Sequence, residues 1–184
     1  TWGSGSWGGD SSAVASQLNG TIDVVEIFST NTAFAALRAD GSVVTWGTGT
    51  GGGDSSAVAS QLNGTIDVVE IFSTFSAFAA LRADGSVVTW GGLGGDSSAV
   101  ASQLNGSNDV VKIFSTGEAF AALRADGSVV TWGSFSGGNS SAVASQLNGS
   151  NDVVEIFSTR YAFAALRADG SVVTWGISFS GGNS

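Results

Sequence analysis

Few side chains in this sequence could do chemistry, and most of them recur at matched positions. The 184 residues include 15 acidic and 6 basic residues but no His and no Cys. Zinc sites built from His and Cys, and catalytic triads that need either residue, are therefore excluded. A glycosidase would need one pair of carboxylates set apart from the others, whereas the carboxylates here are copied from unit to unit. We therefore predict that the chain is not an enzyme and has no catalytic residue.

An Arg stands two residues before an Asp-Gly pair at four places in the chain. A functional interpretation of this pattern is a site for an anion or a carboxylate. The structural interpretation is a surface charge pair, which is common in proteins and individually weak. We favour the structural interpretation for all four arginines, which are Arg38, Arg82, Arg124 and Arg167.

A second acidic set suggests a calcium hypothesis, because Ca²⁺ prefers oxygen ligands. No unit has the dense Asp spacing of a calcium loop, and Asn139 and Asn183 replace the glycine-adjacent Asp in later units. We therefore favour turn and cap roles and predict no metal and no cofactor. The residues concerned are Asp10, Asp23, Asp54, Asp67, Asp96, Asp109 and Asp152.

A sequence repeat must position these side chains. The stretch AFAALRADGSVVTWG begins at Ala33 and returns unchanged three times, and its Leu recurs at spacings of 44, 42 and 43 residues. Repeat arrays are stabilised by contacts between neighbouring units and not by one central core. We predict a single array over residues 1–184, with a partial unit at 1–20, repeats at 21–64, 65–106 and 107–149, and a partial fourth repeat at 150–184.

The residue pattern of each repeat predicts three strands. The alternation in DVVEIFST is typical of a strand and places Val24 and Phe28 on one face, with Val25 and Ile27 on the other. The invariant stretch predicts a hairpin around an Asp-Gly pair, in which both turn residues take positive φ. These structural turns are Asp40-Gly41, Asp84-Gly85, Asp126-Gly127 and Asp169-Gly170.

The segment GGDSSAVASQLNG predicts a short helix or helical turn. Asp10 or Ser11 can cap its start, Val14 and Leu18 lie four residues apart, and Asn19-Gly20 supplies a glycine after its end. A short fourth strand is the alternative, because so short a segment does not establish a period.

The residues FAALRADGSVVTWG resemble the repeat of the regulator of chromosome condensation family. In that family a strand leading to AL, a DG turn and a strand ending in WG mark each blade of a β-propeller. The resemblance implies an all-β repeat protein with propeller-like blades of about 43 residues and short helical turns. It is closest to short, divergent bacterial versions in surface or secreted proteins. An open β-solenoid is the alternative, because the chain opens and closes in the same part of the repeat.

Two residues just before each invariant stretch vary between units. They lie in the turn between the first and second strands, and a second variable patch, which includes Phe135 and Phe179, follows the third strand. Adjacent antiparallel strands place both patches at one end of each unit, where we expect protein or glycan binding. Unconstrained drift is the alternative. The candidate binding tips are Asn31, Thr32, Phe75, Ser76, Gly117, Glu118, Arg160 and Tyr161, and Trp7 belongs to the same end.

Charge and hydropathy limit the partners. The net charge is −9 and the isoelectric point is near 4.1, so the chain lacks the basic patch that nucleic acid requires. No run of about 18 apolar residues exists, so we predict no membrane insertion.

The sequence therefore favours a non-enzymatic repeat scaffold, structural or adhesive, in a bacterial extracellular or cell-surface assembly. Ends in the same phase of the repeat permit self-association head to tail. The alternative is a recognition module that binds protein or glycan through the variable tips.

Overall fold

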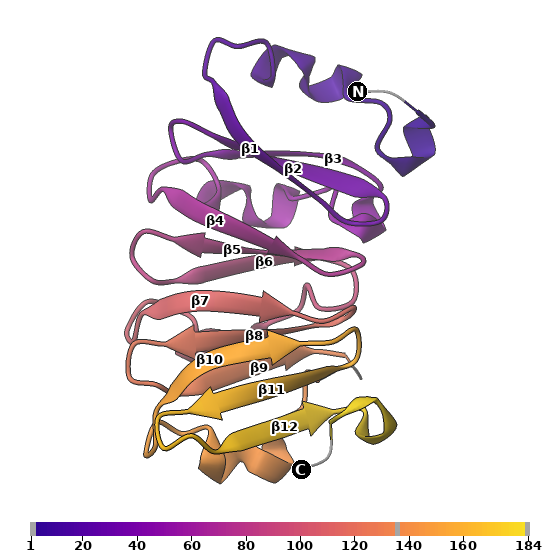
Figure 1. Cartoon of the computed structure of the whole chain (residues 1–184). Helices are drawn as coiled ribbons and strands as arrows, with labels where there is room; N and C mark the ends of the chain where they lie inside the picture. The colour runs from indigo at the N-terminus through magenta and orange to yellow at the C-terminus, as the bar shows by residue number, and fades with distance from the viewer. Residues whose placement is uncertain (1–2, 135–136, 183–184) are drawn as a thin grey trace.

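The computed structural model describes residues 3–134 and 137–182, which form four three-stranded antiparallel sheets. The sheets follow one another in chain order, and in each sheet the strands are ordered as in the sequence (Figure 1). The strands are β1 Val24–Ser29, β2 Ala33–Arg38, β3 Val43–Gly47, β4 Val68–Ser73, β5 Ala77–Arg82, β6 Val87–Gly91, β7 Val110–Ser115, β8 Ala119–Arg124, β9 Val129–Gly133, β10 Val153–Ser158, β11 Ala162–Arg167 and β12 Val172–Gly176.

The segment between successive sheets forms a short 3₁₀ helix, which confirms the helical interpretation over the fourth strand. Each long copy covers SAVASQ, and the amide of Ser12 donates to Asp10 Oδ1 at 2.9 Å at the first of them. The 3₁₀ helices are η1 Gly5–Trp7, η2 Ser12–Gln17, η3 Gly49–Gly51, η4 Ser56–Gln61, η5 Ser98–Gln103, η6 Ser141–Gln146 and η7 Ser178–Ser180. None of these described helices is long or apolar enough to cross a membrane.

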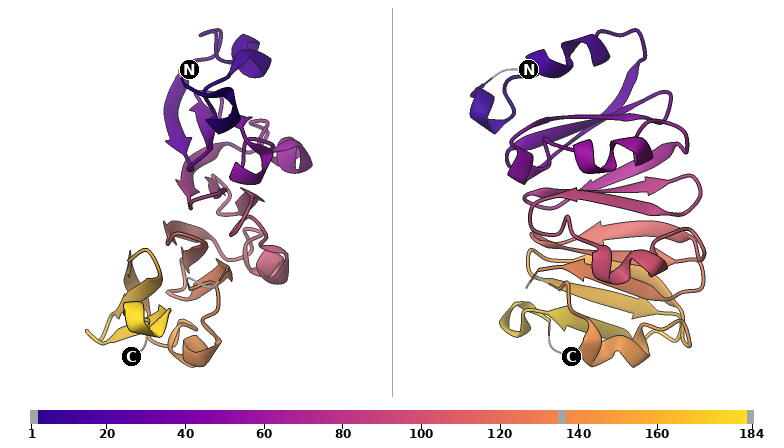
Figure 2. Two further views of the ribbon diagram at one scale, coloured as in Figure 1. Left: turned by 90° about the vertical axis from the view of Figure 1, so that its right-hand side faces the viewer. Right: turned by 180° about the vertical axis from the view of Figure 1, so that it is seen from behind.

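The array is open. The sheets stack as propeller-like blades, the long 3₁₀ helices η2, η4, η5 and η6 lie along one side, and the two ends of the chain lie at opposite ends of the stack (Figure 2). The all-β fold with blades of about 43 residues is confirmed.

Each internal sheet is buried on both faces by its neighbours. In the first junction, Leu37 and Ala35 of one unit pack against Ile71 and Phe78 of the next. Phe78 is fully buried and stacks on Trp90, with ring centroids 5.3 Å apart. Burying a side chain of this size contributes about 1.5–3 kcal/mol, so each junction rests mainly on apolar packing. Two further junctions repeat the same packing.

The first strand of every unit contains a β-bulge, which the sequence did not indicate. Val24 pairs with Arg38 and Glu26 pairs with Leu37, so Val25 is an extra residue without a partner of its own. The other three units have the same bulge.

The bulge changes which side chains share a face, so the predicted alternation is wrong. In the second unit Val68 and Ile71 pack together against the preceding unit, whereas Phe72 packs against the following one. The extra residue shifts the period by one and places both Val69 and Glu70 in solvent.

The Asp-Gly hairpins are confirmed, but the predicted turn type is wrong. Gly41 has a φ of 72°, whereas no described residue other than glycine has positive φ, so Asp40 does not. The amide of Gly41 donates to the carbonyl of Arg38, and the amide of Arg38 donates to the carbonyl of Ser42, both at 2.9 Å. These bonds define a type I turn followed by a left-handed glycine, a three-residue loop in which only the glycine needs positive φ.

A Trp side chain links every unit to the segment before it. Trp90 Nε1 donates to the carbonyl of Gly52 at 3.0 Å, and the other three units have the same bond between residues 38 apart. A Cβ atom on Gly52 would lie 2.6 Å from the Phe78 ring, so only glycine fits there. The variation in repeat length therefore falls between each Trp and the glycine that follows it.

Candidate functional site

The first variable residues of the four turns form one continuous row. The amide of Asn31 donates to the carbonyl of Phe75 at 3.0 Å, that of Phe75 to Gly117 at 3.0 Å, and that of Gly117 to Arg160 at 2.9 Å. These contacts use only main-chain atoms, so the hydrogen bonds themselves do not depend on side-chain type. We call these four residues the tip row.

The second variable residues, Thr32, Ser76, Glu118 and Tyr161, join the tips to the connectors after the third strands. In the first unit the amide of Thr48 donates to the carbonyl of Thr32 at 3.0 Å, and the other three units have the corresponding bond. The predicted placement of both variable patches at one end is therefore confirmed. Trp7 and Phe179 are 69% and 92% exposed, and Phe135 lies outside the described residues.

Side chains from the second and fourth units meet along the tip row. Arg160 Cζ lies 4.7 Å from the centroid of the Phe75 ring and 5.2 Å from that of Tyr161. Cation–π contacts of this kind are each worth about 0.5–1 kcal/mol at exposed sites.

Gly117 makes the contact between Phe75 and Arg160 possible. A Cβ atom on Gly117 would lie 2.6 Å from Phe75 Cε2 and 3.2 Å from the carbonyl oxygen of Arg160. Because Gly117 has no side chain, the ring of Phe75 can cross the third unit and contact Arg160 of the fourth.

A hollow of about 610 Å³ lies beside the tip row. It is lined by the same Ser, Thr and tip residue of each unit, at residues 29–31, 73–75, 115–117 and 158–160. These Ser and Thr residues were not predicted as site residues, because they are identical in all four units and only variable positions were candidates. The volume of the hollow is that of a small-molecule site, and these side chains offer hydroxyl groups to a ligand.

The four Arg-Asp pairs belong to the hairpin turns. In the second unit Arg82 Nε donates to Ser86 Oγ at 2.7 Å, and Ser86 Oγ donates to Asp84 Oδ1 at 2.5 Å. Arg82 and Asp84 also form an ion pair of 3.8 Å. The arginine thus has a partner inside its own turn, which agrees with the structural interpretation.

These hydrogen bonds also affect the acidity of the turn. The hydroxyl of Ser128 donates a hydrogen bond to Asp126. This bond is the main reason why the pKa of the Asp126 carboxyl lies below its usual value of 3.8. The equivalent hydroxyls lower the pKa of Asp40 and Asp169 in the same way.

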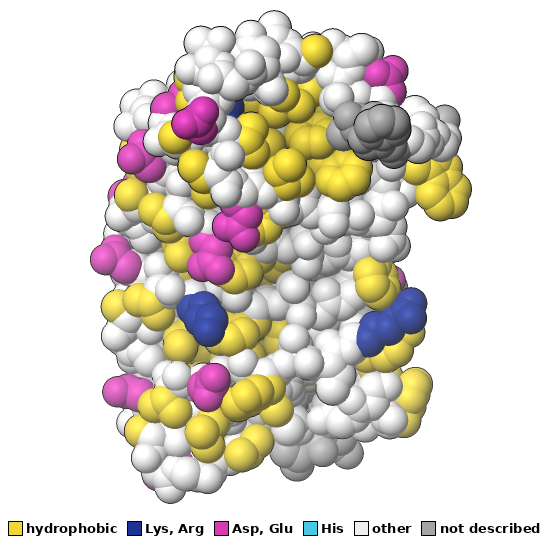
Figure 3. All heavy atoms as spheres, turned by 45° about the horizontal axis from the view of Figure 1, so that its top comes forward, with side chains coloured by type: hydrophobic (Ala, Val, Ile, Leu, Met, Phe, Trp, Pro, Cys, Tyr) yellow, Lys and Arg dark blue, Asp and Glu magenta, His cyan; other side chains and the backbone are white. Residues whose placement is uncertain are grey.

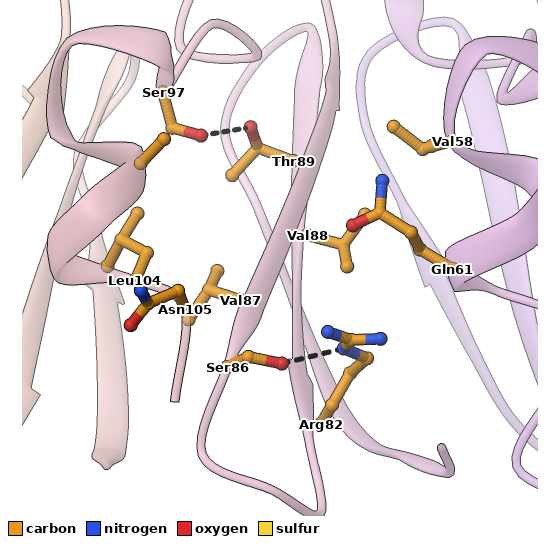
Figure 4. Close-up of a pocket in the computed structure, with 11 residues that line it drawn as sticks. Val58, Gln61, Arg82, Ser86, Val87, Val88, Thr89, Ser97, Leu104 and Asn105 are labelled. Carbon is orange, nitrogen blue, oxygen red and sulfur yellow. Dashed lines mark hydrogen bonds between the residues drawn. The ribbon is translucent and has the colours of Figure 1, made fainter. Parts of the chain in front are cut away.

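Three equivalent outer pockets lie between successive 3₁₀ helices. Figure 4 shows one of about 310 Å³, with Val58 and Gln61 from η4 on one side and Leu104 on the other. The other two measure about 320 and 300 Å³. Since they recur at every junction with the same lining, they are a product of stacking and not one distinctive site.

The acidic residues do not gather into a metal site. Asp67 instead packs against the turn of the preceding unit, where a Cβ atom on Gly41 would lie 2.6 Å from it. Asp54 Oδ1 accepts the amide of Ser56 at 2.9 Å, which lowers the pKa of Asp54. Among residues 3–134 and 137–182, no three His, Cys, Asp or Glu side chains are placed to hold one ion.

The first strands present a further exposed surface. Val25, Val69, Val111 and Val154 are 59%, 52%, 52% and 52% exposed because of the bulge. Beside them the units carry exposed Glu, except that the third unit has Lys112, whose Nζ lies 5.2 Å from the Phe114 centroid. The change from DVVEIF to DVVKIF in the sequence is the signal by which Lys112 could have been singled out as a variable surface residue.

Together, the stacked sheets and the row of loop tips define an open repeat module of the propeller type. No protein-family model matches the chain, and no curated protein matches its sequence. Solved structures do match its fold.

The fold is similar to that of yeast RCC1 (Prp20), solved with Kap60 bound, with 17% identity over 83% of this chain and 43% of that chain and a TM-score of 0.56. Human WBSCR16 matches with 21% identity over 84% of this chain and 48% of that chain, at a TM-score of 0.55. The ectodomain of the Physcomitrella patens receptor kinase CR4 matches with 17% identity over 83% and 39%, at a TM-score of 0.53.

These likenesses confirm that the chain has the RCC1-like β-repeat fold suggested by its sequence. The chain spans less than half the length of each of these three proteins. At identities this low the likeness concerns the fold and not the activity.

Proposed function

We propose that the chain is a non-enzymatic structural scaffold of a bacterial surface or extracellular assembly, built by docking the C-terminal end of one copy onto the N-terminal end of another. The observation that carries this proposal is that the two ends of the array present the two halves of a junction found three times inside it.

The C-terminal end exposes apolar side chains that internal units bury. Val172 is 55% exposed, whereas its counterpart Val87 is 9% exposed. Phe157 is likewise 55% exposed, and Leu166 is half-buried where Leu81 is 6% exposed.

The N-terminal end exposes the other half. Ile27 is 58% exposed, whereas Ile71 and Ile113 are 2% and 1% exposed. Phe34 and Leu18 are half-buried, while their counterparts in later units are fully covered. Figure 3, turned so that this end comes forward, shows hydrophobic side chains gathered beneath the N-terminal segment.

Main-chain groups at the ends are complementary as well. Inside the array the amide of Val68 donates to the carbonyl of Gly41, and the amide of Val43 donates to the carbonyl of Leu62, both at 2.9 Å. Within the described part of the chain, the carbonyl of Gly170 and the amide of Val172 have no such bond. A Cβ atom on Gly170 or Gly181 would meet nothing within 4 Å, so both positions are open to a neighbouring unit.

The apolar content of the ends suits an association that depends on concentration. Full burial of each such side chain contributes about 1.5–3 kcal/mol, whereas association costs at least about 4 kcal/mol in lost freedom of motion. A contact between two different faces forms a filament unless its rotation closes a ring.

The test is the mass of the 184-residue chain by light scattering over a range of concentrations, with negative-stain images. We expect growth with concentration in the wild type and its loss in Ile27→Asp and in Val172→Asp. Val25→Asp is the matched control, because Val25 is 59% exposed but its counterparts remain exposed inside the array.

Mixing the two assembly-deficient variants distinguishes head-to-tail docking from other contacts. Each variant keeps one intact face, so an equimolar mixture should form a heterodimer and grow no further. A wild-type chain that stays monomeric at every concentration would overturn the proposal, as would equal loss of assembly in Val25→Asp.

The surface location rests on composition and resemblance. Only 11% of the residues are charged and 28 are glycine, which suits a low-charge structural repeat. Antibody labelling of intact source cells is the test: the scaffold should be accessible without permeabilisation.

A further inference from the structure

Arg160 is the one Arg of the chain that lies outside the hairpin turns. The four turn arginines each donate from Nε to a Ser hydroxyl at 2.7–2.8 Å. For Arg160 the described residues supply no hydrogen-bond acceptor and no carboxylate within ion-pair distance, although Glu118 belongs to the adjacent turn. Its charge is therefore available to a ligand.

Two aromatic rings hold the guanidinium of Arg160. Phe75 and Tyr161 lie 4.7 and 5.2 Å from its central carbon. An arginine that stacks on an aromatic ring keeps its N–H donors at the edge of the guanidinium plane, where they can bind a ligand. A fixed planar fork of donors matches the two oxygens of a carboxylate.

The hollow next to Arg160 offers hydroxyl groups. Ser29, Ser73, Ser115 and Ser158 line it at matched positions, and none of their hydroxyls forms a hydrogen bond within the described chain. The neighbouring Thr hydroxyls are already used: Thr74 Oγ1, for example, is within 3.3 Å of the carbonyl of Leu93 and accepts the amide of Ala77. Besides Arg160, the Ser hydroxyls and the side-chain amide of Asn31 are thus the polar groups of the hollow without a partner among the described residues.

We propose that this hollow binds a carboxylated sugar, with the Arg160 guanidinium pairing the carboxylate and the Ser hydroxyls bonding the sugar hydroxyls. The volume of about 610 Å³ lies within the usual range for small-ligand sites. The site spans four units, so a short oligosaccharide fits its repeating donors better than one ring does.

An acidic peptide fits the site less well. Extended peptides bind by adding main-chain hydrogen bonds, but the amides of Asn31, Phe75 and Gly117 are already paired along the tip row. Most of the unpaired groups are Ser hydroxyls, which are the natural partners of a polyhydroxylated ligand.

The experiment is calorimetric titration of the chain with trigalacturonic acid, with neutral galactotriose and a tri-aspartate peptide as comparisons. We expect saturable binding of the uronate and much weaker binding of the other two. Arg160→Gln should weaken binding of the uronate about tenfold or more, because it removes charge-assisted hydrogen bonds.

Lys112→Gln is the matched control, since it removes the same charge from the exposed first-strand surface and should leave the affinity unchanged. Gly117→Ala should also weaken binding, because it displaces the Phe75 ring that holds Arg160. Circular dichroism checks that each variant is folded.

Several outcomes would overturn the proposal: no saturable binding by the wild type, equal binding of the neutral sugar, tighter binding of the peptide, or equal weakening by Arg160→Gln and Lys112→Gln. The site goes beyond the scaffold role and is independent of it. The assembly-deficient Ile27→Asp variant should therefore bind the uronate as the wild type does.

Discussion

The stacked sheets and the tip row both join neighbouring units, but they do so through different atoms. The sheets meet through side chains such as Phe78 and Ile71, which are 0% and 2% exposed. The tips meet through main-chain bonds from the amide of Phe75 to Gly117 and from Gly117 to Arg160.

This difference explains why the tips can vary whereas the side chains packed between sheets cannot. A side chain packed between two sheets must fit both neighbours, so the same residue is required in every unit. A main-chain bond is indifferent to the side chain beside it, so the tips can carry Asn, Phe, Gly and Arg in succession.

The largest effect should come from a cavity between sheets. Phe120 is fully buried and stacks on Trp132 at 5.3 Å, so Phe120→Ala should lower the free energy of unfolding by about 3–5 kcal/mol. Phe179 is 92% exposed, and Phe179→Ala should change it by less than about 0.5 kcal/mol. Urea denaturation followed by Trp fluorescence measures both, and equal shifts would contradict the comparison.

A smaller effect should come from two glycines with the same backbone conformation. Gly52 and Gly181 both have φ of 94°, but only at Gly52 would a Cβ atom meet the Phe78 ring, at 2.6 Å. Gly52→Ala should therefore cost about 1–3 kcal/mol more than Gly181→Ala, because both variants have the same backbone strain and only one has a packing clash. Thermal denaturation of the two variants side by side would refute this if their midpoints coincided.

A third effect tests the tip row itself. Gly117→Ala should cost about 1 kcal/mol by forcing the Phe75 ring out of its position. Truncating that ring with Phe75→Ala should remove the cost, so the two substitutions should be coupled in a double-mutant cycle measured by urea denaturation. Additive effects would show that the tips do not interact.

The smallest effect should be the response of the turns to acid. The pKa of Asp126 is lowered in the folded chain, chiefly by the Ser128 hydroxyl, so its carboxylate stabilises the fold above the unfolded value of 3.8. That stability is lost as the pH falls through the lower, folded pKa. Thermal midpoints should therefore drop from about pH 4 downward, and less steeply in Asp126→Asn; an unchanged slope would argue against the turn as the cause.

Much of the fold could be predicted from the sequence because the repeat carries strong local signals. The Asp-Gly hairpins and the shared end of both variable patches follow from turn chemistry and antiparallel pairing, and the first strand follows from its β-branched and aromatic residues. The 3₁₀ helix follows from SAVASQ with Asp10 before it.

The bulge and the turn type could not be predicted because they depend on pairing. Val25 is the extra residue only because Val24 and Glu26 pair with adjacent residues of the next strand, and nothing in VVEIFS marks that offset. The turn type depends on the hydrogen bond from the amide of Arg38 to the carbonyl of Ser42, which leaves three residues in the loop and requires positive φ only at the glycine.

The candidate site was predicted in composition but not in arrangement. Phe75, Gly117 and Arg160 were each singled out as variable, yet their contact depends on the register between units, which places the three in one row. The Ser lining was missed because its residues vary too little to stand out.

The fixed separation of 38 residues between each glycine acceptor and the next Trp has a practical consequence. All length variation falls in the connector just before that glycine. Each connector is therefore an insertion site where a foreign loop could be grafted without disturbing the junctions between units. Because loop closure becomes only slowly less favourable with length, by about 0.6 kcal/mol for each doubling, such a display scaffold could carry inserts of quite different size.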